Sequence, residues 1–575
     1  MSTRGGKVHV ATTRRHYNGK TYETHLLRRT FRQGGKVHNE TVGNLSHLPL
    51  ATIDVIRRSL AGETFFSSAD LVLRRSQDHG NVVVVLGLLR QLGLDKIIDP
   101  THSRQRDLCV GMVVARLLRL GSKLATTRQW NNSTLPSVLG IENADEDELY
   151  AAMDWLVKRQ AKIEARLAKR HLAHDALVLY DLSSTYMEGR HCSLAKIGYS
   201  RDGKKGTLQI EYGLISDQEG RPVAVEVVEG NTSDPATVPG AVRKLKDRFG
   251  LREVVLVGDR GMLTSARIEA LKQDGLGWVS SLRSPQIRKL VDGGDLQLSI
   301  FDEMNLAEIT HPDYPGERLV VCKNPLLATE RARKREDLLL ATEKKLAPVL
   351  AAVEAGRLRG AADIGIRVGK VKDHYNVGKH FAIQITKSSL RIARKQDEIT
   401  KEAALDGIYV VRTSVTTDRL DSAGVVRAYK RLVKVERVFR GFKSIDIAVR
   451  PVHHRAPDRV RAHIFLCMLA YYVQWHLERA WASLLFRDQQ TPVNDDPVAK
   501  AHRSDKALEK ASTQQLQDGS PVHSLRTLLD HMRTLSRDTM SASSDAAATT
   551  FKVIGQPTPL QARALALLSL KPTSL

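Results

Sequence analysis

ALVLYDLSS, residues 176–184, and EVVLVGDRG, residues 253–261, are the two stretches that decide the fold. In each of them a continuous run of apolar residues leads into an aspartate and a polar cluster. Continuous apolar runs, unlike alternating ones, indicate strands that are covered on both faces of a sheet. We therefore expect two buried strands that end at Asp181 and Asp259, where an open α/β sheet presents its functional edge to a ligand.

Two more strands and a helix are expected between these runs. LQIEYGLIS (208–216) and PVAVEVVEG (222–230) are joined by a polar turn, and VPGAVRKLKDRFG (238–250) has a helical pattern. The predicted order is strand, strand, strand, helix, strand.

The two aspartates have neighbours that suit a functional site. An Asp beside a buried strand costs on the order of several kcal/mol to keep charged unless a positive group compensates it. Helix caps or loop carboxylates remain an alternative. Leu-Ser-Ser-Thr after Asp181 and Arg-Gly-Met after Asp259 favour a site, because small and flexible residues let a substrate come close.

A third carboxylate lies on a helix that we expect from about Ala423 to Phe442. One face of this helix, with members three or four positions apart, carries Tyr429, Leu432, Glu436, Arg440 and Lys443. An ordinary exposed helix with one Glu–Arg pair, worth about a few tenths of a kcal/mol, would also fit. However, the other positions are basic as well, which suits a phosphate backbone better than packing. These positions are Lys430, Arg431, Lys434 and Arg437.

The rest of the chain divides by its residue patterns into further segments. Residues 1–65 are predicted to form a small basic β-hairpin, with a turn at Gly34 and Gly35, followed by a helix. Residues 66–172 show helical periodicity and are predicted to be a helical DNA-binding region, with plain helical packing as an equally compatible alternative. The first part of the core is placed at 173–272, an inserted α+β domain at 273–405, the second part of the core at 406–486, and a polar, partly flexible tail at 487–575.

Composition points to a polyanionic partner. The chain has 575 residues and a net charge of +24, so several structural units and a nucleic-acid partner are expected. A basic surface kept for solubility is the alternative. The four cysteines lack metal-ligand spacing, which predicts core residues of a reduced protein. No stretch has the length of a membrane span, so a soluble protein without a membrane partner is expected.

These motifs resemble the DDE transposases of bacterial insertion sequences. The resemblance lies in Asp181, in GDRG at 258–261 and in YKRLVKVERVFRGFKS at 429–444, and it covers about residues 175–480. The branch it matches carries a Tyr-x2-Arg-x3-Glu-x6-Lys signature. Tyr429, Glu436 and Lys443 stand at that spacing, whereas Leu432 occupies the place of the Arg. The GNTSD loop (230–234) and the sequence at 450–473 resemble one large subgroup of these enzymes.

The resemblance implies a fold, a chemistry and a set of site residues. The fold would be RNase H-like, a mixed α/β sheet flanked by helices, with an inserted domain before the glutamate. Asp181 would bridge two Mg²⁺ ions, which Mn²⁺ could replace, and Asp259 and Glu436 would each complete one. Tyr429 and Lys443 would contact DNA phosphates, and helical geometry adds Arg440. Arg260 would reach a phosphate or form a structural ion pair.

The predicted function is DNA transposition of the cut-and-paste type. The partners would be double-stranded DNA, both the terminal inverted repeats of the element and the target, and a second copy of the chain in a synaptic complex. The expected location is the cytoplasm of a bacterium, in association with the nucleoid. Two alternatives stay open: a nuclease or resolvase of the same fold that cuts without rejoining, and a non-catalytic DNA-binding protein descended from a transposase.

Overall fold

The structure is a computed structural model that divides into two units. The first unit comprises residues 1–76 and 537–555, and the second comprises residues 77–536 and 556–575. The described residues are 6–63, 65, 71–173, 176–189, 191–293, 296, 301–444, 446–492, 494–541 and 550–575.

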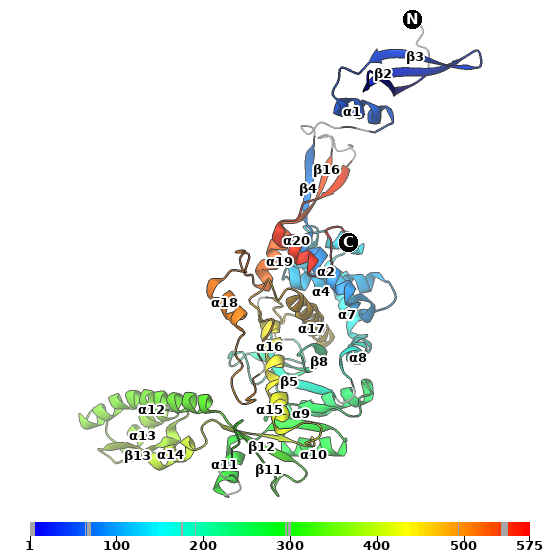
Figure 1. Ribbon diagram of the computed structural model, residues 1–575. Helices are drawn as coiled ribbons and strands as arrows, with labels where there is room; N and C mark the ends of the chain where they lie inside the picture. Colours follow the sequence, from blue (N-terminus) through cyan, green and yellow to red (C-terminus); the bar gives the residue numbers. More distant parts are fainter. Residues whose placement is uncertain are drawn as a thin grey trace. The chain divides into compact units, whose positions relative to one another are not determined.

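The first unit begins with a three-stranded antiparallel sheet (Figure 1). Its strands are β1 (Lys7–Tyr17), β2 (Lys20–Gln33) and β3 (Lys36–Asn44). The turns are Asn18-Gly19 and Gly34-Gly35, all with positive φ, which is the conformation that tight hairpins require. The turn at Gly34-Gly35 was predicted, but the turn at Asn18-Gly19 was not. The structure therefore has two consecutive hairpins where a single hairpin was expected. Helix α1 (Leu50–Leu60) packs against β1.

A second sheet of this unit joins segments from the two ends of the chain. Its order is β17-β16-β4, formed by β4 (Val72–Asp78), β16 (Ser536–Ser541) and β17 (Thr550–Ile554). Arg74 Nε donates to Ser541 Oγ at 2.8 Å, and Ser76 Oγ donates to Asp538 at 2.6 Å. The predicted flexible tail therefore contributes ordered strands; of its residues, 493 and 542–549 lie outside the described part.

The second unit is built on a mixed sheet of nine strands among the described residues. The order is β11-β12-β15-β10-β9-β5-β7, with β6 and β8 both pairing with the far edge of β7. Strand β9 runs parallel to β5 and β10, and the other pairs are antiparallel. The strands are β5 (Leu177–Tyr186), β6 (Lys196–Ile197), β7 (Leu208–Ser216), β8 (Pro222–Glu229), β9 (Val255–Val257), β10 (Gly277–Ser281), β11 (Leu306–Ile309), β12 (Arg318–Lys323) and β15 (Ile408–Thr413).

The register between β5 and β9 sets the two aspartates side by side. Leu177 pairs with Val255 and Leu179 with Val257, an offset of 78 positions that also separates Asp181 from Asp259. Asp259 follows the end of β9, as predicted. Asp181, however, lies inside β5 and not at its end, because β7 pairs with β5 as far as Tyr186.

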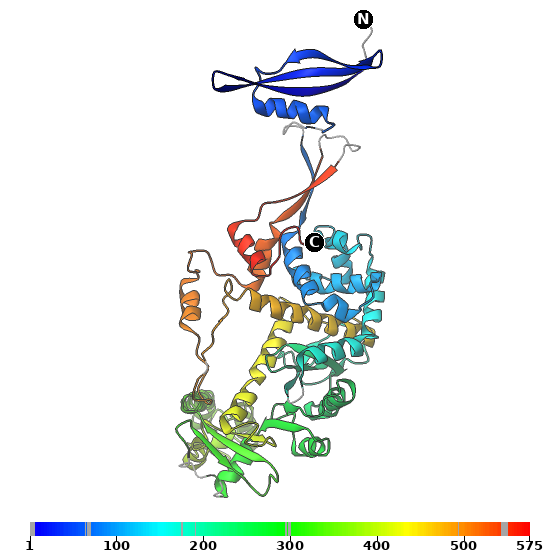
Figure 2. The same cartoon turned by 45° about the vertical axis from the view of Figure 1, so that its right-hand side comes forward.

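Helix α17 (Pro457–Ala480) forms the centre of the second unit. It contacts α4 and α7 on one side and strand β8 of the sheet on another (Figure 2). Sixteen of its residues are buried, which explains why its sequence is apolar all round. The remaining helices of the N-terminal half are α2 (Gly80–Gln91), α3 (Leu94–Ile98), α4 (Arg104–Leu118), α5 (Lys123–Trp130), α6 (Leu135–Leu139), α7 (Glu146–Val157), α8 (Gln160–His171), α9 (Asp234–Arg243), continued by a π-helical turn at Lys244–Arg248, and α10 (Ser265–Gln273).

The helix predicted to carry Glu436 is in fact two helices. Helix α15 (Ser422–Lys430) and helix α16 (Leu432–Lys443) are separated at Arg431. Helix α16 packs on β5. The ring of Phe442 stacks on that of Tyr212 in β7, with 6.2 Å between centroids, so the helix is fixed to the sheet by its aromatic face.

The predicted insertion, 273–405, is too wide. Strands β10, β11 and β12 belong to the main sheet, and α11 (Ser284–Asp292) packs with them in one apolar core. A separate pair of small cores begins only with the long helix α12. This smaller insertion comprises α12 (Pro325–Glu354), α13 (Ala361–Lys372), a 3₁₀ turn at Gly378–His380, β13 (Phe381–Ile385), β14 (Leu390–Arg394) and α14 (Gln396–Ala403).

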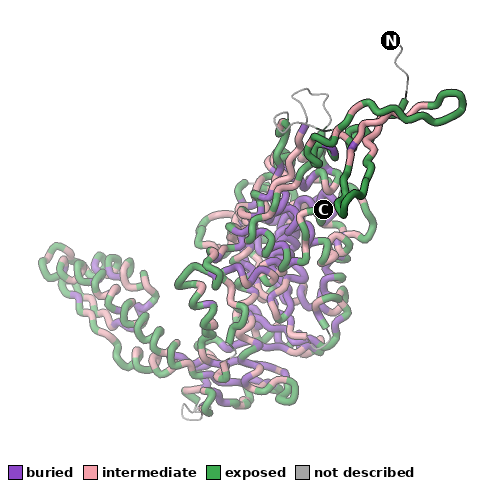
Figure 3. Tube along the Cα trace, turned by 45° about the horizontal axis from the view of Figure 1, so that its top comes forward, coloured by how far each residue is buried: buried purple, intermediate pink, exposed green. Residues whose placement is uncertain are grey.

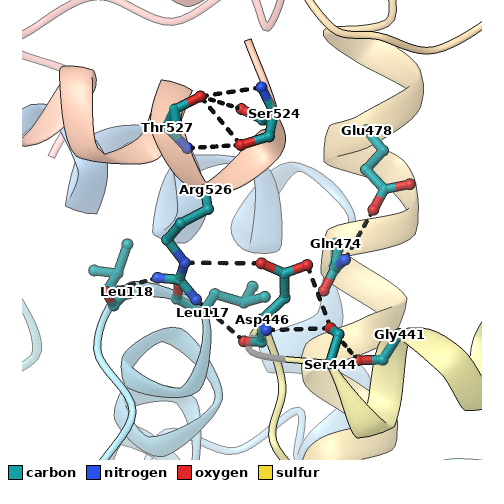
Figure 4. Close-up of polar contacts among 10 residues, drawn as sticks. All are labelled: Leu117, Leu118, Gly441, Ser444, Asp446, Gln474, Glu478, Ser524, Arg526 and Thr527. Atoms are coloured by element: carbon teal, nitrogen blue, oxygen red, sulfur yellow. Dashed lines mark hydrogen bonds and ion pairs between the residues drawn. The ribbon is translucent and has the colours of Figure 1, made fainter.

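The C-terminal segment also differs from the polar tail that was expected. It forms α18 (Asp505–Thr513), α19 (Leu525–Arg533) and α20 (Pro559–Ala566). Arg526 of α19 donates to the carbonyl oxygens of Leu117 and Leu118 and lies 3.7 Å from the Asp446 carboxylate (Figure 4). The apolar side of α19 is buried against α2. The average polarity of this segment does not reveal such a one-sided apolar helix.

Burial follows this architecture. The buried residues concentrate in the second unit, whereas the first sheet is mostly exposed or intermediate (Figure 3). The four cysteines are buried and unpaired, as predicted for core residues. Within the described residues, no helix has the length and apolar character needed to cross a membrane.

The stacking of Phe442 on the sheet gives a stability prediction. Phe442→Ala removes a fully buried ring and should lower the free energy of unfolding by about 3–5 kcal/mol. Urea unfolding followed by tryptophan fluorescence measures this. Val433→Ala on the same helix is the control, because Val433 is 48% exposed and should change stability by less than about 0.5 kcal/mol. Equal effects of the two substitutions would contradict the packing described.

Candidate active site

The three carboxylates singled out in the sequence line one cleft of about 490 Å³. Asp181 comes from β5, Asp259 from the loop after β9, and Glu436 from α16. The strand register brings Asp181 and Asp259 together, and Glu436 joins them because α16 packs on β5. Asp181 is partly buried, whereas Asp259 and Glu436 are exposed to the cleft.

Cationic and polar side chains complete the cleft. Arg260 lines it and forms no ion pair with a residue that the structure describes. Arg331, from the beginning of α12, also lines it, so the insertion contributes to the site. Arg331 was not predicted, because its only signal in the sequence is a run of charges on a long helix. Tyr429 and Leu432 are in the same cleft.

Asp181 lies in an environment that disfavours its charge. Burial raises its pKa to about 7, and the nearby charges of Asp259 and Glu436 act in the same direction. Two influences oppose this rise: the Leu182 amide donates to Asp181 Oδ1 at 2.8 Å, and the Arg201 guanidinium is nearby. The cleft therefore holds negative charge that the protein alone does not fully neutralise.

Tyr429 orients Asp259. The Tyr429 hydroxyl donates to Asp259 Oδ1 at 3.4 Å and lies 2.7 Å from Ser281 Oγ. Burial is the main cause that raises the pKa of Tyr429, to about 12, so the hydroxyl keeps its proton and remains a donor. Because the Tyr429 hydroxyl donates its proton to Asp259, the hydroxyl of Ser281, at the end of β10, donates to the Tyr429 oxygen. Nothing in the sequence pointed to Ser281, because β10 itself was not predicted.

A partly buried ionic network lies beside Asp181. Arg201 pairs with Glu211 on β7, and with Asp234 at 2.5 Å. Asp234 is the last residue of the GNTSD loop. A side chain added at Gly261 would be 3.8 Å from the Asp259 carboxylate and 3.9 Å from that of Asp234, so this loop faces the one that follows β9. Arg201 lowers the pKa of Asp181, but it also serves two other carboxylates and does not cancel the effect of burial.

Arg440 and Lys443 lie away from the three carboxylates. They line a separate basic pocket, also of about 490 Å³, together with Arg201 and Arg450. Lys443 Nζ lies 2.8 Å from the buried Asp202 carboxylate, which Arg450 also contacts at 2.5 Å. Burial lowers the pKa of Lys443. The shared face proposed for the five residues of the signature helix is therefore divided between two pockets.

The other basic residues of this helix pack better than predicted. Lys430 Nζ donates to the carbonyl oxygens of Val498 and Ala499, at 2.9 and 2.8 Å. Lys434 pairs with Glu219 at 3.0 Å. The expectation that a helix basic on nearly every side is poor for packing was wrong at these two positions, because the chain supplies partners that periodicity cannot show.

The cleft contains the ligand type that a divalent metal ion needs. Carboxylate oxygens are hard donors suited to Mg²⁺ or Mn²⁺, and the raised pKa of Asp181 marks a place where a cation would be stabilised. Within the described residues, however, no three His, Cys, Asp or Glu side chains are arranged as a ready metal site. The three carboxylates are suitable ligands for a divalent metal ion, and binding one ion together requires them to move closer to one another.

The pKa of Asp181 predicts a pH dependence of stability. Its raised value means that the folded protein holds a proton that the unfolded chain releases near pH 4, so this stabilisation is complete below pH 4 and is lost as the pH rises through 7. Asp181→Asn keeps the shape without the charge. In urea unfolding without divalent ions, the free energy of unfolding of this variant should rise relative to that of the wild type from pH 5 to pH 7.5. A constant difference across this range would contradict the shift.

Two family models match the chain. The model described as the transposase DDE domain matches residues 184–473, which is just over half of the chain. Asp259 and Glu436 lie inside the match, and Asp181 lies three residues before its start. The model described as the N-terminal domain of IS1634 family transposases matches residues 10–71, which include most of the first sheet and all of α1.

Individual proteins and solved structures give weaker matches than the family models. No curated protein matches the chain. A cryo-EM structure of the piggyBac transposase synaptic complex with hairpin DNA matches with 9% identity and a TM-score of 0.34, covering 79% of this chain and 78% of that one. A TM-score this low does not establish a common fold. The family models suffice: a chain with a DDE domain over half its length and an IS1634-type N-terminal domain belongs to the DDE transposases of insertion sequences.

Proposed function

We propose that this transposase cuts DNA at the ends of its element and joins the freed 3′ ends to a target, in a cut-and-paste reaction. The observation that carries the proposal is the meeting of Asp181, Asp259 and Glu436 in one cleft. The mixed sheet flanked by helices supports an RNase H-like core. The cleft also contains Arg260 and Arg331, which suits a phosphodiester substrate.

Asp181, Asp259 and Glu436 are the residues that would hold divalent ions, with Mg²⁺ as the physiological choice and Mn²⁺ as a substitute. When bound, two such ions supply activation of the attacking oxygen and stabilisation of the leaving 3′ oxygen in an in-line displacement. The protein's own contribution is position. The β5–β9 register fixes the two aspartates, and the Tyr429 hydroxyl holds Asp259 by one oxygen.

The remaining site residues are proposed to position DNA. Arg260 and Tyr429 are close enough to the carboxylates to contact a phosphate near the cut. Arg440 and Lys443 would hold a more distant part of the backbone in their basic pocket. Lys443 would then share its charge between Asp202 and a phosphate. Leu432 stands where related enzymes have an arginine, and Arg331 supplies a cation to the same cleft from a different element.

The proposed partners are the terminal repeats of the element, target DNA and a second copy of the chain. Joining two ends in one event requires two active sites on one DNA complex, which makes a dimer the simplest assembly. The alternatives are a nuclease that does not rejoin and a DNA-binding protein without catalysis. Three intact carboxylates in one cleft speak against the second alternative.

Alanine at any of the three carboxylates should abolish cleavage. With labelled element ends and Mg²⁺ or Mn²⁺, wild type is expected to nick the ends and to integrate a pre-cleaved end into plasmid DNA. Asp181→Ala, Asp259→Ala and Glu436→Ala should each lose both activities by a factor of about 10³ or more, while DNA binding stays near wild type, because the reaction requires all three ligands.

The matched control is Asp397→Ala, an exposed carboxylate on α14 outside the cleft, which should leave cleavage and integration unchanged. Hydrolysis of ends without integration would favour the nuclease. Binding without any metal-dependent nicking by the wild type would favour the non-catalytic protein. If alanine at one of the three carboxylates leaves cleavage intact, that residue does not belong to the active site.

Tyr429→Phe should weaken cleavage without abolishing it. The substitution keeps the ring and removes the hydroxyl that holds Asp259, and loss of such an orienting group typically costs about 10- to 100-fold. Single-turnover cleavage rates measured against Mn²⁺ concentration test this: the apparent metal affinity should fall together with the rate. Ser281→Ala is expected to act in the same direction with a smaller effect. An unchanged metal dependence in Tyr429→Phe would show that the hydroxyl does not position Asp259.

A further inference from the structure

The N-terminal sheet has two chemically different faces. Alternate residues of a strand point to opposite faces, and directly paired residues point to the same one. Arg57 of α1 donates to Thr12 Oγ1, and Thr12 is hydrogen-bonded to the buried His25 on the neighbouring strand. These contacts identify the face that α1 covers. The other face, which includes Thr13 and its partner Thr24, is here called the open face.

The two faces differ in charge. The pairing places five cations on the open face: Lys7, Arg15, Lys20, Arg28 and Arg32. Both carboxylates of the three strands are on the covered face. Glu23 is opposite Arg14 and forms an ion pair with it at 2.6 Å, and Glu40 is opposite Arg29.

The cations of the open face are not used by the protein itself. None of the five forms an ion pair or side-chain hydrogen bond with another residue in the described part of the chain. Lys7, Arg15, Lys20 and Arg32 are exposed, and Arg28 is intermediate. Five uncompensated cations on one face of so small a sheet repel one another, so a polyanion laid on this face would be stabilised.

Polar and aromatic groups accompany these charges. Tyr17 and Tyr22 belong to the open face and are 66% and 54% exposed. Thr13 and Thr41 are exposed on it as well. Hydroxyl groups of this kind donate to phosphate oxygens or to base edges, and none of these side chains carries a negative charge that would repel DNA.

The dimensions of the open face match a DNA groove. From Lys20 to Arg32, twelve positions along β2 at about 3.3 Å each give about 40 Å, slightly more than the roughly 34 Å of one duplex turn. Three strands about 4.8 Å apart give a backbone width of about 10 Å, comparable with the roughly 12 Å of the major groove.

We propose that the open face of the sheet β1-β2-β3 binds double-stranded DNA, with its five cations on the phosphates that flank a groove. This inference rests on the proposed function, and it adds a DNA-binding surface whose residues are distinct from those of the cleavage site. The uneven distribution of charge supports it, since a basic surface kept for solubility has no reason to confine its carboxylates to one side.

The experiment compares two triple variants of the full chain. Arg15→Gln/Lys20→Gln/Arg28→Gln removes three charges from the open face. Arg29→Gln/Arg57→Gln/Arg58→Gln removes three from the covered face and α1, and its ion pairs are exposed and contribute little to stability. Binding of a duplex of about 40 bp with an element end is measured by fluorescence anisotropy between about 50 and 300 mM salt, a range in which phosphate binding changes strongly. A thermal melt verifies folding.

The open-face variant should bind about tenfold more weakly or worse, and the slope of log K against log salt should fall by about 3, roughly one for each cation removed from a phosphate. The covered-face variant should keep the wild-type slope. Equal losses of affinity in the two variants, no loss in the open-face variant, preference for single-stranded over duplex DNA, or no duplex binding by the wild type would each overturn the proposal. A wild type that binds through this face but does not cut would refute the proposed function and leave this inference standing.

Discussion

The parallel pairing of β5 with β9 is the constraint on which the rest of the site depends. Leu177 opposite Val255 fixes an offset that leaves Asp181 and Asp259 level with each other, 78 positions apart in the chain. A change of one residue in this register would turn one aspartate to the opposite face of the sheet. Helix α16 then adds Glu436, because Phe442 stacks on Tyr212 of the neighbouring strand β7 and holds the helix against the sheet. The candidate site is thus assembled by apolar packing that contains none of its three carboxylates.

Burial and nearby like charges disfavour the ionised form of Asp181 in the assembled cleft. Asp181 is held near two other carboxylates, and the partly buried guanidinium beside it, that of Arg201, is already shared by Glu211 and Asp234. The Tyr429 hydroxyl limits how Asp259 can turn, and the exposed Arg260 stands beside it. This arrangement suits a site that orders itself around its ligands, consistent with described carboxylates that share a cleft without forming a ready metal site.

Segments far apart in the sequence contribute to both units. Strand β4, near the N-terminus, shares a sheet with β16 and β17 from near the C-terminus, and the insertion supplies Arg331 to the cleft through the first turns of α12. The insertion has small cores of its own and yet contributes a side chain to the lining of the cleft. The two proposed DNA surfaces differ in chemistry: the cleft combines acids with cations, and the open face of the first sheet carries cations alone.

Sequence by itself identified the three carboxylates proposed for the site and most of the elements that carry them. Buried strands are indicated by continuous apolar runs, and a carboxylate beside such a run is noticeable because it is costly there, so Asp181, Asp259 and Glu436 could be named in advance. The turn at Asn18-Gly19 could have been named too, since Asn-Gly is a strong hairpin signal. Only the tertiary structure decided that Asp181 lies inside a strand, that β10 to β12 extend the main sheet, and that Ser281, Arg201 and Arg331 surround the carboxylates. Strand pairing and ion pairing join residues that are distant in the chain, and the local periodicity of a sequence carries no record of which distant partner a residue will meet.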